Sequence, residues 1–139
     1  MRALAIDFGS KNIGIAVSDA LGITVRPVET IRRSSLNEDI ERLIFLLEDL
    51  EVESVVVGLP LRMDGTIGDM AEKTLRFIEQ LRAKTTIPIV TQDERLTSYE
   101  AEQIMMEQGL NRAQRRRRSD EVAATIILQD YLATIITNY

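Results

Sequence analysis

The spacing of apolar residues predicts strands over the first part of the chain. Residues 4–6 form a short apolar run that ends at Asp7, and a Gly-Ser-Lys-Asn turn follows. Apolar and small residues then alternate over residues 13–17, which is the period of a half-buried strand. A third strand is expected over residues 23–31, where Pro27 favours an edge position or a bulge because proline cannot donate to the ladder.

From residue 35 onward the spacing becomes that of helices separated by short strands. A Ser-x-x-Glu capping box begins a predicted helix over residues 35–50. A β-branched run over 52–57 is typical of a strand buried on both faces. A second amphipathic helix is predicted over 70–81, and a short strand is predicted over 87–91.

Two more helices are expected toward the C-terminal end. A Thr-x-x-Glu capping box opens one at Thr97, which Gly109 ends, and Ser119 is expected to cap the last one, whose apolar positions run to Ile135. The order β-β-β-α-β-α-β-α-α predicts an α/β fold with a mixed five-stranded sheet flanked by helices. No linker, repeat or shift of composition divides the chain, so residues 1–139 are expected to form a single domain.

Composition excludes several kinds of chemistry. The 139 residues include no Cys and no His, so thiol and imidazole nucleophiles, a Ser-His-Asp triad and a thiolate or imidazole zinc site are absent. A metal ion would need oxygen ligands, which favours Mg²⁺ or Mn²⁺. The first residues have the pattern of neither a signal peptide nor a membrane span, and longer apolar runs fall short of about 20 residues. A cytoplasmic protein without membrane contact is expected.

Positive charge is concentrated in one segment of an acidic protein. The formal net charge is −5, which argues against general adhesion to nucleic acid. Between Gln108 and Ser119 there is no acidic residue, and five arginines lie in this segment: Arg112, Arg115, Arg116, Arg117 and Arg118. The last four are favoured as contacts to nucleic-acid phosphates because they directly precede Asp120 in an otherwise acidic protein, and a solvated charged loop is the alternative interpretation.

Three carboxylates fall where ligands bind in α/β sheets, beyond the carboxyl ends of strands. Asp7 ends the first predicted strand, Glu94 follows the last, and Asp120 is expected in the first turn of the final helix. Right-handed crossovers would place the first and fourth strands side by side, so these acids can converge. Clustered carboxylates repel one another unless a cation neutralises them, which makes this a candidate phosphoryl-transfer site with one or two metal ions. Each acid also has a structural interpretation in a turn, an ion pair or a helix terminus.

The motifs that contain these acids resemble those of a known family. They are DFGSKNIGIAVSD at 7–19, VVGLP at 56–60 with Asp64-Gly65, DERLTS at 93–98, and DEVAA at 120–124 with ILQ at 127–129. In this order, and almost end to end, the chain resembles the bacterial pre-16S rRNA nucleases, which are also described as Holliday-junction resolvases of the ribonuclease H-like superfamily. The resemblance implies a ribonuclease H-like fold, metal-dependent hydrolysis of phosphodiester bonds and maturation of the 5′ end of 16S ribosomal RNA.

By this resemblance the family's acidic triad is Asp7, Glu94 and Asp120. We expect Asp7 to bridge two Mg²⁺ or Mn²⁺ ions and the other two acids to hold one each, so no histidine base is required. Lys11, in the turn after Asp7, is a candidate phosphate ligand. Two features depart from the family pattern. Four arginines and Ser119 precede Asp120 where the family often has mixed Lys and Arg with a glycine, and no residue is a secure fourth carboxylate.

Several alternatives remain open at this level. The substrate is precursor 16S rRNA or branched DNA, ribosome-assembly factors are candidate partners, and the chain is a monomer or a homodimer, the latter being normal for a resolvase. A non-catalytic nucleic-acid-binding module is a further hypothesis. An actin-like or sugar-kinase ATPase shares the Asp-x-Gly hairpin but needs two such domains, and this length provides one.

Overall fold

The computed structural model describes residues 1–94 and 103–137, without the side chains of 115–120 and 136–137. Its elements follow the predicted order, with residues 103–107 also helical. They are β1 (Ala3–Phe8), β2 (Asn12–Ser18), β3 (Val25–Arg32), α1 (Leu36–Asp49), β4 (Ser54–Leu59), α2 (Asp69–Arg82), β5 (Ile89–Asp93) and α4 (Arg112–Thr137). The expected helix start at Thr97 lies outside the described residues, whereas the predicted end at Gly109 is confirmed by its φ of 76° and the helix-closing bond from Leu110 N to Met105 O.

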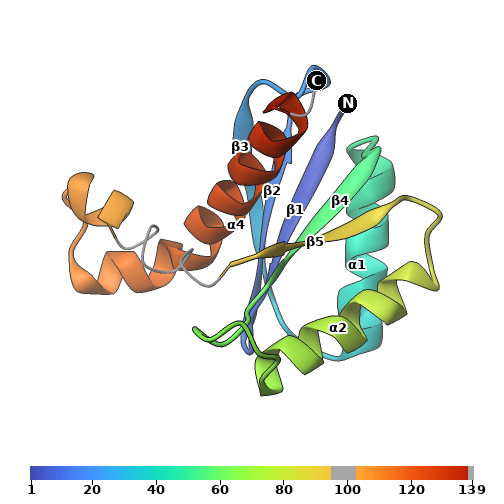
Figure 1. The fold of residues 1–139 in the computed structure, drawn as a ribbon, viewed down its shortest axis with the longest axis horizontal. Coiled ribbons are helices and arrows are strands. Elements are labelled where there is room, and N and C mark those ends of the chain that lie inside the picture. Colours follow the sequence, from blue (N-terminus) through green and yellow to red (C-terminus); the bar gives the residue numbers. More distant parts are fainter. Residues whose placement is uncertain (95–102, 138–139) are drawn as a thin grey trace.

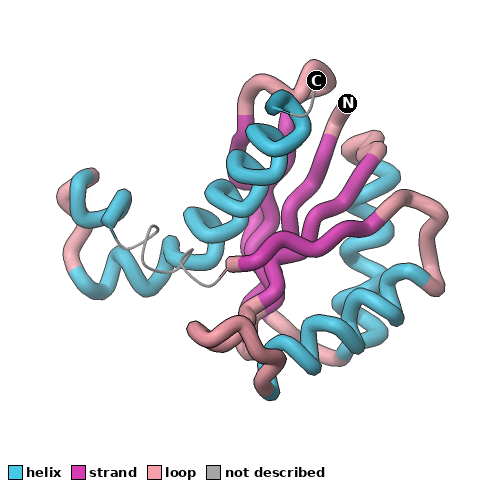
Figure 2. Tube along the Cα trace, viewed as in Figure 1, coloured by secondary structure: helices cyan, strands magenta, loops and turns pink. Residues whose placement is uncertain are grey.

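The five strands form one mixed sheet in the order β3-β2-β1-β4-β5, as predicted. β1, β2 and β3 are antiparallel neighbours, whereas β4 and β5 run parallel to β1. Helices α1 and α2 cover one face of the sheet, and α4 covers the other (Figures 1 and 2). The carboxyl ends of β1, β4 and β5 therefore meet at one edge of the sheet, which is where the sequence predicts a site.

Pro27 lies at an irregular point of the edge strand β3. The pairing of β3 with β2 shifts between Ile15 and Ala16, so that Ile15 pairs with Glu29 and Ala16 pairs with Pro27. One residue is skipped in this ladder, as in a β-bulge. The sequence predicts either an edge position or a bulge for Pro27, and both are confirmed. Neither position requires the backbone N–H that proline lacks.

β4 and β5 each begin and end two residues later than the sequence predicts. Val52 donates its N–H to Leu47 O and closes the end of α1 through Glu51, which has a φ of 54°, so Val52 precedes β4. β5 starts after Pro88, which has no N–H to give to a ladder. The shift brings Asp93 into the last pair of the sheet and leaves Glu94 directly beyond it.

Two apolar cores hold the layers together. The larger one packs the sheet against α1 and α2. The smaller one packs α4 onto a patch of alanines that includes Ala3, Ala5 and Ala16, all with no exposed area. Such small side chains let the helix backbone approach the sheet closely, because little volume separates them. Within the described ranges, no helix combines the length and the apolar character that crossing a membrane requires.

α4 begins eight residues earlier than predicted, and Ser119 is not its cap. Asn111 Oδ1 accepts the N–H of Gln114 at 2.9 Å, and Gln114 Oε1 accepts the N–H of Asn111 at 2.9 Å. This reciprocal pair satisfies two donors at the helix start in the manner of a capping box. Arginine also favours helices, so the run at 115–118 continues the helix and does not form the expected loop.

This start of α4 depends on a single side-chain acceptor and can be tested there. Asn111→Ala removes the acceptor and should weaken the first turn by about 1 kcal/mol. We expect faster amide hydrogen exchange at residues 113–115 and unchanged exchange at Leu128, deep in the sheet contact. Unchanged exchange at residues 113–115 would show that the cap is not needed.

Candidate active site

Asp7 lies on the α4-facing side of the sheet, near the carboxyl end of β1. Side chains alternate along a strand, and Ala3 and Ala5 of β1 belong to the core beneath α4. Asp7 continues this series and is half-buried, while its Cα partner on β2 is Gly14. Gly14 therefore adds no side chain next to Asp7 on β2.

Glu94 reaches Asp7 by crossing the strand that separates them. β4 lies between β1 and β5, and the Glu94 N–H donates to Leu59 O at 3.2 Å at the end of β4. A Cβ placed on Gly58 would contact a Glu94 carboxyl oxygen and lie 2.9 Å from the Glu94 carboxyl carbon. The Glu94 side chain therefore lies directly over Gly58, and only glycine leaves this path free.

The two carboxyl groups share a proton in the metal-free protein. The pKa of Glu94 is raised from 4.5 to about 8, first by burial, then by the negative charge of Asp7 and by a hydrogen bond between the two carboxyl groups. The charge of Asp93 adds to the same effect. A divalent cation can replace the proton and neutralise the pair, so these oxygens fit the ligand preference of Mg²⁺ or Mn²⁺.

Position 120 of α4 lies toward the same edge of the sheet. A Cβ at Gly58 would lie 2.5 Å from Ile127 Cδ1, and the Tyr131 hydroxyl lies 3.5 Å from Ser54 Oγ at the start of β4. α4 therefore runs opposite to β4, with its N-terminal half toward the carboxyl ends of the strands. Position 120 is about two turns before Ile127 along this helix.

Asp120 thus occupies the third turn of α4 and not the expected first turn, because the helix starts at Arg112. The dipole of a helix N-terminus does not act on it as the sequence suggested, since that effect is confined to the first turn. Within the side chains that the structure describes, no three acidic residues form a metal-binding group. The structure brings Asp7 and Glu94 together, and the contribution of Asp120 stays a prediction.

The predicted phosphate ligands lie at the same end of the molecule. Lys11 is exposed in the turn between β1 and β2, three residues beyond the end of β1. Residues 115–118 belong to the first turns of α4, which extend beyond the sheet (Figure 1). Successive positions of a helix are about 100° apart, so four consecutive positions are distributed around most of its circumference and do not share one face.

Thr30 is a polar residue of this region that the sequence analysis missed. Gly14, the partner of Asp7, pairs on its other side with Thr30 of β3. The Thr30 Oγ1 is buried and has no hydrogen-bond partner among the described residues. A buried hydroxyl without a partner is rare and marks a place where a polar ligand or water can bind. Nothing in the sequence indicates this neighbour, because the bulge in β3 sets the register that places it.

The fold is that of ribonuclease H-like junction resolvases. Among solved structures, Thermus thermophilus RuvC in complex with a Holliday junction substrate matches 98% of this chain and 96% of its own, with a TM-score of 0.64 and 17% identity. The fowlpox virus resolvase with its Holliday junction DNA matches 97% of this chain and 99% of its own, with a TM-score of 0.59 and 13% identity. At these identities the likeness establishes the fold alone.

Sequence comparison defines the family. The model of the RuvX family, described as Holliday junction resolvase, matches residues 1–134, and this chain belongs to that family. A relative from Clostridium acetobutylicum is 48% identical over 97% of this chain and 100% of its own length. A relative from Natranaerobius thermophilus is 46% identical over 95% of this chain and 94% of its own. Both relatives carry the description "Putative pre-16S rRNA nuclease".

The role of Gly58 can be tested by adding one methyl group. Gly58→Ala places a Cβ against Glu94 and Ile127 and should destabilise the protein by about 1 to 3 kcal/mol in urea denaturation. In a Glu94→Ala background the penalty should fall, because one of the two displaced side chains is gone. Equal penalties in both backgrounds would contradict the path of Glu94 over β4.

The shared proton predicts how stability depends on pH. Because the pKa of Glu94 is about 8 in the folded protein and 4.5 without its environment, the folded state holds an extra proton between these values. Stability in EDTA should therefore decrease from pH 5 to pH 8, by at most about 1.4 kcal/mol per pH unit. Glu94→Gln should flatten this decrease, while Glu41→Gln on the exposed side of α1 should keep it. Urea denaturation across the pH range measures both, and a flat wild-type profile would rule out the shared proton.

Proposed function

We propose that this protein is a divalent-metal-dependent nuclease that hydrolyses phosphodiester bonds at the edge of the sheet where Asp7 and Glu94 meet. The observation that carries the proposal is the carboxyl pair itself, held over Gly58 with a strongly raised pKa for Glu94. A strongly perturbed carboxyl group beside a second acid is typical of a functional site. Membership of the RuvX family supports the same class of reaction.

Asp7, Glu94 and Asp120 are the proposed metal ligands, with Asp7 between two ions and each other acid holding one. Bound Mg²⁺ or Mn²⁺ would supply Lewis acidity to the phosphoryl group and its attacking water. Glu94 gives up its proton when a cation joins the pair, so metal binding should strengthen as the pH approaches its pKa of about 8. The hydrogen bond and the strand positions fix both carboxylates before substrate binds, which reduces the ordering required in the reaction.

The positive groups at this end of the molecule would hold the nucleic acid. We assign phosphate contacts to Lys11 and to the run Arg115, Arg116, Arg117 and Arg118. With a net charge of −5, the rest of the protein would repel a polyanion, so these local cations decide where a strand can lie. Only three Phe and three Tyr are present, which favours recognition of the phosphate backbone over base stacking.

Precursor 16S ribosomal RNA is the first substrate that we propose, because relatives that match nearly the whole chain are described as pre-16S rRNA nucleases. This role would place the protein in the cytoplasm, in contact with ribosome-assembly factors. A four-way DNA junction is the second candidate, favoured by the family description and by the resolvase fold. Junction resolution would need a symmetric dimer, whereas RNA processing is open to a monomer.

Asp7→Asn tests the proposed reaction while keeping the shape of the side chain. We expect Mg²⁺- or Mn²⁺-dependent cleavage to fall by at least about 100-fold, because the amide removes a charged metal ligand. Binding of the substrate in EDTA should be retained. Labelled precursor 16S RNA and a four-way DNA junction are incubated with each metal or with EDTA, and the products are separated on gels.

Asp49→Asn is the matched control, because Asp49 is exposed at the end of α1 and far from the carboxyl pair. This variant should cleave like the wild type. Cleavage that persists in Asp7→Asn would remove Asp7 from the site. A folded wild type that binds both nucleic acids and cuts neither would favour the non-catalytic binding module.

A further inference from the structure

A second positively charged surface lies at the turn between β1 and β2, separate from the arginine run. It is a pocket of about 610 Å³ with six lining residues, three of them cationic and none acidic. The lining residues are Ser10, Lys11, Asn12, Arg32, Arg33 and Ser34. We call it the hairpin pocket. Its chemistry is that of an anion site, with cations and neutral hydrogen-bond donors together.

Sheet pairing builds the hairpin pocket from segments far apart in the sequence. Asn12, the first residue of β2, pairs with Arg32 at the end of β3. The Arg33 N–H then donates to Lys11 O at 2.8 Å. The turn itself is tight, since a Cβ on Gly9 would lie 2.7 Å from Asn12 O. These backbone contacts hold the backbone of the three cationic residues close together without a ligand.

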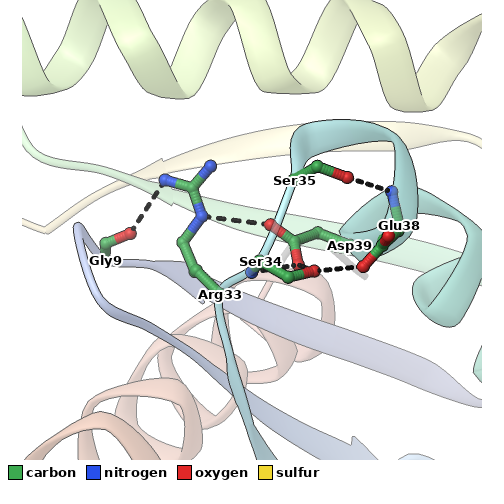
Figure 3. A network of polar contacts seen from close by, with 6 residues as sticks. All are labelled: Gly9, Arg33, Ser34, Ser35, Glu38 and Asp39. Atoms are coloured by element: carbon green, nitrogen blue, oxygen red, sulfur yellow. Dashed lines mark hydrogen bonds and ion pairs between the residues drawn. The ribbon is translucent and has the colours of Figure 1, made fainter.

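Arg33 forms a rigid wall of the pocket (Figure 3). Its Nε lies 3.2 Å from Asp39 Oδ2, one guanidinium nitrogen lies 3.5 Å from Gly9 O, and its guanidinium carbon lies 4.3 Å from the centre of the Phe8 ring. Asp39 is buried and also accepts the N–H of Ser34 at 3.1 Å. The Arg33 charge is thus largely balanced by Asp39, and the residue serves to shape the pocket.

Lys11 and Arg32 supply the charge that is left for a ligand. Both side chains are exposed, and neither forms an ion pair within the described part of the chain. Two neighbouring positive charges without anions repel each other, so they do not stabilise the fold. A backbone phosphate between them, with its one negative charge, would relieve this repulsion.

The hairpin pocket is close to the carboxyl pair. Asp7 on β1 is three residues before Ser10, the first lining residue of the pocket, which corresponds to at most about 10 Å at the usual strand rise. Thr30 is on the same side of the sheet as Asp7, because both pair with Gly14. Arg32 follows Thr30 by two residues in the same strand and is therefore on that side too. Successive phosphates of one strand advance about 3.4 Å along a duplex, so the pocket lies a few nucleotides from Asp7.

We propose that the hairpin pocket binds a backbone phosphate of the nucleic acid, a few nucleotides from the bond that is cut. Lys11 and Arg32 contact the phosphate, and Arg33 holds the wall against which it lies. The proposal rests on the proposed nuclease function and adds Arg32 and Arg33 to the surface that holds the strand. With the arginine run of α4, the strand is then held on two sides of the carboxyl pair.

The test is a double substitution, Lys11→Gln with Arg32→Gln, measured by fluorescence anisotropy with labelled single-stranded RNA and with a four-way DNA junction. Arg33 is kept, since its loss would leave the buried carboxylate of Asp39 without its cation. Measurements in EDTA separate binding from cleavage. The slope of log affinity against log salt should fall by about 0.7 to 0.9, because the pocket neutralises one phosphate of the strand. Affinity near 0.1 M salt should fall by about 10-fold or more.

Arg26→Gln with Lys73→Gln is the matched control. It removes the same two charge types from exposed positions on β3 and α2, and Arg26 lies at the far end of the strand that carries Arg32. This control should keep the wild-type salt slope. An equal loss in the control would show a general charge effect and would overturn the hairpin pocket as a site. Circular dichroism confirms that both double variants are folded.

The outcomes also separate this inference from the proposed function. Unchanged affinity and slope in the Lys11 and Arg32 double variant, with wild-type cleavage that still needs Asp7, would overturn only the hairpin pocket. A wild type that neither binds nor cuts either nucleic acid would overturn both. A loss confined to one of the two nucleic acids would support the pocket and assign it to that substrate.

Discussion

The close approach of two carboxyl groups across β4 is the constraint on which the rest of this structure depends. Glu94 can meet Asp7 only because Gly58, between them, has no side chain. The pair would be unfavourable with both groups charged, and a shared proton or a cation removes that penalty. In its metal-free form the pair therefore stabilises the fold less as the pH rises toward 8.

The packing of α4 on the sheet positions the carboxyl groups of Asp7 and Glu94. Alanines on β1 and β2 let the helix lie close to the sheet, and Ile127 of α4 fills the space above Gly58 beside Glu94. The same packing fixes the direction of the helix, so that its N-terminal half approaches the carboxyl ends of the strands. A close fit of this kind tolerates little change in volume, which couples the stability of the core to the position of the acids.

Positive charge is concentrated at the same end of the molecule as the carboxyl pair. The acidic body repels nucleic acid, and the cations that attract it gather at one end, in the first turns of α4 and around the turn between β1 and β2. The cations around this turn differ in how their side chains are held. Arg33 contacts Asp39 and Gly9 (Figure 3) and the ring of Phe8. Lys11 and Arg32 form no ion pair with the residues that the structure describes.

The sequence by itself determined the order of the elements, the mixed sheet, the edge position of Pro27 and the nearness of Asp7 to Glu94, because hydrophobic period and strand order are local or nearly local signals. The sequence predicts the wrong start for α4, because Ser119 matches the usual cap residues better than Asn111 does. The observed cap is the pair of hydrogen bonds between Asn111 and Gln114. Only the tertiary structure decided the path of Glu94 over Gly58, the row from Asp7 to Thr30 and the hairpin pocket. Each depends on strand register and on contacts between distant segments, which no local pattern records.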